Sequence, residues 1–149
     1  MKTTLKTLLF FLLIGFSTSC NSQDYEKLPS KEVDARKIKM AQDFSDRFYS
    51  SLKNGGPYEF NNDATDEMRN VLSAEHQESL YNKIKEQNGD YAGIEYVEAW
   101  TQKSNSQYTF LRYKGTFSKS TTKVEIRVVL DKANKVAGFF IKPWSDMFG

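Results

Sequence analysis

The stretch KVEIRVVLDKANKVAGFFIKPW, residues 123–144, decides the fold because two strand patterns in it flank a short turn. Apolar residues alternate with polar ones in its first half, namely Val124, Ile126, Val128 and Leu130. This period of two predicts a strand with one buried face. Only the segment DKANK, residues 131–135, separates it from the next β-branched and aromatic run. Such a short connection favours an antiparallel hairpin.

The same strand pattern begins earlier in the chain. IEYVEAWT (94–101) and YTFLRYKGTF (108–117) are rich in aromatic and β-branched residues, and short polar segments follow them. We therefore expect four antiparallel strands after residue 91.

The residues before this sheet have the period of a helix. Apolar side chains recur at three- and four-residue steps within 34–54, namely Ile38, Ala41, Phe44, Phe48 and Leu52. Asp34 is the expected N-cap, and Asn54-Gly55 the expected end. A short helix is predicted near 68–72, and a third follows the N-cap Ser73 as far as Asn88-Gly89. Helices before an antiparallel sheet predict an α+β fold with the helices packed on one sheet face.

The chain begins with the layout of a secretory signal peptide. Lys2 and Lys6 precede the apolar run 8–16, and the small residues 17–19 lead to Cys20. The run is too short for a membrane span, which needs about 20 apolar residues. We expect residues 1–19 to be a signal peptide.

Cys20 directly follows the small residues SerThrSer, and here the chain resembles bacterial lipoprotein precursors. In that family the cysteine after the signal peptide receives a diacylglyceryl group and becomes the acylated N-terminus. The resemblance implies lipidation of Cys20 and attachment to the bacterial cell envelope, on the outer membrane facing the periplasm. Two or more acyl chains anchor a protein stably. The alternative is an ordinary signal peptide followed by a free cysteine.

The rest of the chain is expected to form a tether and one domain. Residues 20–32 are polar and indicate a flexible tether, and residues 33–149 suit a single hydrophobic core. Removal of residues 1–19 takes away Lys2 and Lys6 and leaves 19 basic and 19 acidic residues. This neutral balance does not favour nucleic-acid binding.

The closing strand, turn and strand from Val124 to Pro143, with weaker likeness back to Ile38, is similar to the nuclear transport factor 2-like (cystatin-like) fold. It looks like a small domain of unknown function that occurs on lipoproteins. The resemblance implies a long helix across a curved sheet, which makes a cone with a pocket. It implies no particular reaction, because this fold carries enzymes and binding modules alike.

The sequence predicts neither a metal site nor a cofactor. His76 is the only histidine, Cys20 is the only cysteine, and no glycine-rich phosphate loop is present. His76 in the first turn of a helix is expected to be a surface or capping residue.

The aromatic content suggests a pocket on the sheet. The candidate pocket residues are Tyr96, Trp100, Tyr108, Phe110 and Arg112. We expect Tyr96 and Trp100 to share one strand face, with Arg112 orienting a small apolar ligand. Phe139 and Phe140 point to opposite faces, so both sides of the last strand are apolar. Either this second face is a binding surface, or Trp144 and Phe148 cover it.

The function expected is therefore a lipid-anchored, non-catalytic binding protein for a small ligand or an envelope protein. One alternative is a protein-interaction module with a basic sheet face made by Arg112, Lys114, Lys123 and Arg127. Another is an isomerase or dehydratase of the ketosteroid isomerase type, which needs a carboxylate beside a tyrosine inside the cone. Residues available for that chemistry are Asp90, Glu95, Glu98, Tyr91, Tyr96, Tyr108 and Tyr113.

Overall fold

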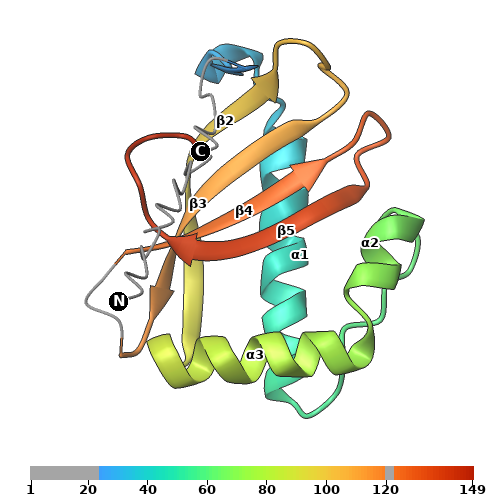
Figure 1. Cartoon of the computed structure of the whole chain (residues 1–149), viewed down its shortest axis with the longest axis vertical. Helices are drawn as coiled ribbons and strands as arrows, with labels where there is room; N and C mark the ends of the chain where they lie inside the picture. The colour runs from blue at the N-terminus through green and yellow to red at the C-terminus, as the bar shows by residue number, and fades with distance from the viewer. Residues whose placement is uncertain (1–23, 120–122) are drawn as a thin grey trace, which may run out of the picture.

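The structure, a computed structural model, describes residues 24–119 and 123–149 (Figure 1). Along the chain, helices precede the longer strands of an antiparallel sheet, so the predicted α+β class is confirmed. The expected signal peptide and Cys20 lie outside the described residues. Within the described ranges, no helix has the length and apolar character that a membrane span requires.

Helix α1 (Ala35–Lys53) follows the predicted pattern. The side chain of Asp34 accepts a hydrogen bond from the main-chain N–H of Arg36 at 2.9 Å, which confirms the N-cap. The predicted stripe faces the interior: Ala41, Phe44, Phe48 and Leu52 are buried, and Ile38 packs against the same core. Burying a large apolar side chain contributes about 1.5–3 kcal/mol, so this stripe holds α1 on the sheet.

The two shorter helices are also capped by their sequence neighbours. Helix α2 (Asp66–Val71) begins after Thr65, whose hydroxyl accepts from the main-chain N–H of Met68. Helix α3 (Ala74–Asn88) begins after Ser73, as predicted. Gly89 ends α3 with a φ of 86°, and a Cβ there would come within 2.4 Å of the Ser118 hydroxyl. Glycine is therefore required at that turn.

Within residues 24–119 and 123–149, the sheet has five strands in chain order, each antiparallel to the next. They are β1 (Tyr25–Lys27), β2 (Tyr91–Gln102), β3 (Thr109–Phe117), β4 (Val124–Leu130) and β5 (Val136–Pro143). The expectation of four strands is wrong, because Tyr25–Lys27 pair with Trp100–Gln102 and add an edge strand. These residues were expected to be part of the tether. A 3-10 turn, Ser30–Glu32, follows them before α1.

The main core lies between α1 and one face of the sheet. In Figure 1, α1 crosses behind the sheet, α3 lies across its lower end, and the red C-terminal segment turns in front. Phe139 of β5 packs against Phe44 and Phe48, with ring centroids 5.3 and 5.0 Å away. The Tyr113 hydroxyl donates to the main-chain oxygen of Ile38 at 2.8 Å, which ties β3 to α1.

Candidate functional site

The two faces of the sheet are covered by different parts of the chain. We call the face that contacts α1 the helix face, and the other the outer face. On β3, Leu111 and Tyr113 lie on the helix face and are fully buried. Phe110 and Arg112 alternate with them and therefore lie on the outer face.

The structure separates two of the candidate pocket residues, Tyr96 and Trp100. Tyr96 pairs with Tyr113 but Glu98 pairs with Arg112, so β2 has one extra residue, Val97. A β-bulge of this kind turns the following side chains to the other face. Tyr96 therefore lies on the helix face, whereas Trp100 lies on the outer face. The expectation that they share a face is wrong, because a simple period of two does not reveal a bulge.

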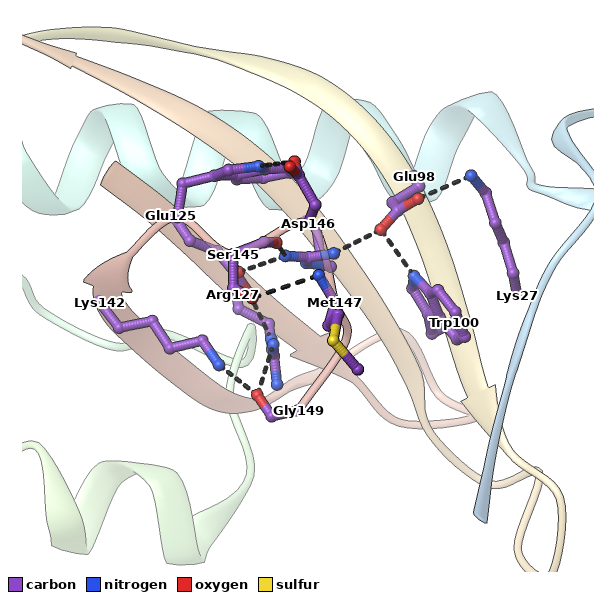
Figure 2. A network of polar contacts seen from close by, with 12 residues as sticks. Lys27, Glu98, Trp100, Glu125, Arg127, Lys142, Ser145, Asp146, Met147 and Gly149 are labelled. Carbon is purple, nitrogen blue, oxygen red and sulfur yellow. Dashed lines mark hydrogen bonds and ion pairs between the residues drawn. The ribbon is translucent and has the colours of Figure 1, made fainter. Parts of the chain in front are cut away.

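Arg112 lies at the centre of a buried ionic network on the outer face. Figure 2 labels its partners Glu98 and Glu125, together with Arg127. Its side chain is fully buried, and its guanidinium contacts Glu98 of β2 at 2.5 Å and Glu125 of β4 at 2.6 Å. It also donates to the main-chain oxygen of Ser145 at 2.6 Å. Arg127, two residues further along β4, contacts Glu125 at 2.7 Å. Arg112 thus binds partners within the chain instead of orienting a ligand.

Glu98 is held in its charged form by this network. Burial by itself raises the pKa of a carboxylate. Hydrogen bonds from Lys27, Trp100 and Arg112 outweigh that burial and lower the pKa of Glu98 below its usual value. The carboxylate thus serves as an acceptor for three donors at neutral pH, which does not suit the role of a general base.

The C-terminal tail, residues 144–149, covers this part of the outer face. The Trp144 ring centroid lies 4.3 Å from the Arg112 guanidinium. Phe148 is only 4% exposed and stacks on Trp100 at 4.7 Å. Its ring also contacts Tyr25 of β1, with centroids 4.9 Å apart. For this half of the outer face, the alternative in which Trp144 and Phe148 provide cover is confirmed.

The other half of the outer face is an open, mostly apolar groove of about 290 Å³, here called the aromatic groove. Its lining includes Tyr108, Phe110, Val129, Gly138 and Phe140, together with Thr65 and Glu67. Phe140 is 52% exposed, which is unusual for so large an apolar side chain. Two candidate pocket residues, Tyr108 and Phe110, line it. Sequence reasoning missed Phe140 as a site residue, although the Phe139-Phe140 pair was the signal.

The four residues proposed as a basic sheet face do not form one. Arg112 is buried, and Arg127 is bound to Glu125. Lys114 lies over the ring of Trp144, 4.9 Å from its centroid. Lys123 lies at the far end of β4, beside α3. This expectation is wrong because Glu125, which alternates with the apolar residues of β4 in the sequence, is fully buried beside the arginines.

The carboxylates considered for catalysis do not meet a tyrosine in the helix-face core. Asp90 pairs with Lys85 at 3.3 Å, and Glu95 is exposed. Two other carboxylate contacts, which the sequence reasoning missed, involve Tyr58, which is buried in the core, and Tyr91, which packs against the core. The Tyr91 hydroxyl donates to Asp46 at 2.5 Å, and the Tyr58 hydroxyl donates to Asp63.

These tyrosines act as structural donors. Burial, together with the neighbouring Asp63, raises the pKa of Tyr58 to about 12. Burial and Asp46 raise the pKa of Tyr91 well above its usual value. Both phenols therefore keep their protons at neutral pH.

His76 and the described carboxylates do not form a metal centre. The His76 ring nitrogen Nδ1 is 2.9 Å from the main-chain oxygen of Val71, between the two short helices. This matches a capping role. Among residues 24–119 and 123–149, no group of three His, Cys, Asp or Glu side chains is placed to hold a metal ion.

The fold and the outer face together define a small α+β domain with a half-covered sheet. Residues 45–139 match the DUF3887 family, described as proteins of unknown function, and the chain belongs to this family. The match leaves out β1 and the C-terminal tail. No curated protein and no solved structure matches the chain.

Proposed function

We propose that the protein is a lipid-anchored binding protein of the bacterial cell envelope, whose domain captures a neutral apolar ligand without catalysis. The observation that carries this proposal is the aromatic groove with its half-exposed Phe140. Exposed apolar surface of this kind is typical of ligand and partner sites.

The lining of the groove defines the class of ligand. Tyr108, Phe110 and Phe140 supply ring faces and edges, and Val129 supplies aliphatic surface. Glu67 is the one charged residue that the described part of the chain contributes to the lining, so the groove disfavours anions. A volume of about 290 Å³ lies just below the range for small-molecule sites, about 300–1,000 Å³. An aromatic or short aliphatic group therefore suits it best.

The position of the groove differs from the position of the pocket that the nuclear transport factor 2-like resemblance implies. A long helix across an antiparallel sheet supports that resemblance. However, the space between α1 and the sheet is filled by the chain's own side chains, since Phe48, Leu111 and Ile126 are fully buried. The proposed ligand therefore binds the outer face.

Binding of indole, a neutral aromatic probe, tests the groove. The full chain in a non-ionic detergent is studied by saturation-transfer NMR, with empty micelles as background. Phe140→Ser should reduce the transfer to indole at least threefold, because it removes a half-exposed wall. Val71→Ser, at an apolar residue that is 66% exposed on α2, is the matched control and should leave the transfer unchanged. Equal transfer in parent and Phe140→Ser would refute the proposed site.

The lipid anchor is tested separately with Cys20→Ala. The parent chain, expressed in a Gram-negative host, should fractionate with membranes and carry acyl mass on its N-terminal peptide. Cys20→Ala should move the chain to the soluble fraction or leave its signal segment uncleaved, with no acyl mass in either case. A parent chain without acyl mass rules out lipidation at Cys20.

A further inference from the structure

A second groove lies between α3 and the ends of β4 and β5, away from the aromatic groove. It has a volume of about 280 Å³, and we call it the lysine groove. Its lining includes Lys83, Gln87, Lys123 and Lys142, together with Ile84 and Ile141. In Figure 1, β5 is the last strand of the sheet on the side where α3 runs below it.

The side chains around the lysine groove favour an acidic occupant. Ile84 and Ile141 provide apolar surface within it. Lys83 and Lys123 are exposed, and neither has an ion-pair partner within the described ranges. Lys142 also lines the groove, but its ammonium donates to the main-chain oxygen of Gly149 in the C-terminal tail (Figure 2), so the charge available to an occupant comes from Lys83 and Lys123. Among the described residues, no acidic side chain is part of the lining.

The neighbouring edge of β5 offers main-chain hydrogen-bonding groups. The chain itself uses the start of this edge: Val136 forms a parallel bridge with Ala64, and its N–H donates to the oxygen of Asp63 at 2.8 Å. Farther along, at Phe139 and Ile141, the described residues supply no main-chain partner beyond β4. An exposed strand edge is a ready template for another extended segment.

We propose that the lysine groove binds an extended acidic peptide of a partner protein, which adds to β5 as a further strand. Strand addition lets main-chain hydrogen bonds supply affinity and alternate side chains supply specificity. One set of peptide side chains would face Ile84 and Ile141, while acidic groups reach Lys83 and Lys123. The run from Phe139 to Pro143 is about 17 Å long at ~3.4 Å per residue, so a short peptide covers it.

A peptide can use both the lysines of the groove and the main-chain groups at the edge of β5. A lipid headgroup or a free anion would use only the lysines. The proposal does not depend on the lipid anchor or on the aromatic groove, since no residue lines both grooves.

A random octapeptide display library, screened against the full chain in a non-ionic detergent, tests the proposal. We expect selected peptides to alternate acidic with β-branched residues. Their affinity should fall at least tenfold for the double variant Lys83→Glu/Lys123→Glu. The matched control Lys103→Glu/Lys132→Glu reverses two exposed lysines in other turns and should change the affinity less than twofold.

N-methylation of the best selected peptide separates strand addition from simple charge attraction. Two peptides are compared, one methylated on the odd-numbered amides and one on the even-numbered amides. One of them should bind at least tenfold more weakly and the other almost as well as the unmethylated peptide, because only one set of amides faces β5. Equal effects in both registers would overturn the proposal, as would a selection without acidic sequences. Vesicles with 30% anionic phospholipid provide a third test. If they bind the parent but not the double variant, while no peptide does, the lysines face a membrane and the proposal is wrong.

Discussion

Arg112 neutralises two carboxylates that would otherwise be buried together. Glu125 is fully buried, and the side chain of Glu98 is only 10% exposed. A buried ion pair adds little compared with apolar packing, but removal of one partner leaves a costly unpaired charge. Arg112 therefore allows the carboxylates of Glu98 and Glu125 to be buried on the outer face.

Replacement of Arg112 by Met should lower the free energy of unfolding by about 3–5 kcal/mol, because both carboxylates lose their buried cation. Urea unfolding of the full chain, followed by tryptophan fluorescence, measures this loss. The control is Arg36→Met, at an exposed pair with Asp34, which should change the free energy of unfolding far less because solvent screens the pair. Similar losses for the two variants would show that the Arg112 network behaves as a surface ion pair.

At the scale of elements, the C-terminal tail acts as a cover for half of the sheet. Phe148 joins the tail to three other aromatic residues, since its ring lies within 6 Å of the rings of Tyr25, Trp100 and Phe110. Its ring also lies 4.2 Å from the Arg127 guanidinium, a cation–π contact. These contacts form a small second core outside the main one.

Phe148→Ala should therefore destabilise the fold by about 3 kcal/mol, as truncation of a buried phenylalanine commonly does. The emission of Trp100, which loses its stacking partner, should shift to longer wavelength. Met147→Ala, at a neighbour that is 72% exposed, should change the stability by less than about 0.5 kcal/mol. Unchanged stability and emission in Phe148→Ala would mean that the tail does not cover Trp100 in solution.

Most elements could be predicted because their patterns are local. Asp34 and Ser73 cap helices through hydrogen bonds to residues two or three positions away, and the apolar residues at every second position of β4 lie within seven consecutive residues. Strand β1 was missed because Tyr25–Lys27 is too short to show a period. It exists through pairing with Trp100–Gln102, which lie far along the chain.

At the scale of the whole molecule, the site was harder to predict than the fold. Tyr108 and Phe110 line the aromatic groove, but its other wall, Phe140, comes from a strand two positions away in the sheet. The burial of Glu125 depends on Arg112 and on the path of the tail. A periodic pattern reveals neither the aromatic groove nor the burial of Glu125, because both depend on contacts between segments that are distant in the chain.

The edge position of β1 has a consequence for how the domain would be oriented beside a bilayer. Cys20 precedes Tyr25 by a stretch that is at most about 17 Å long when extended. If Cys20 carries the lipid, this short linker keeps the β1 edge of the sheet close to the lipid headgroups. Strand β5 forms the opposite edge of the sheet, about 19 Å away at ~4.8 Å per strand. The domain would therefore be attached at its β1 edge, and its lysine groove would face the aqueous space, where other proteins can bind it.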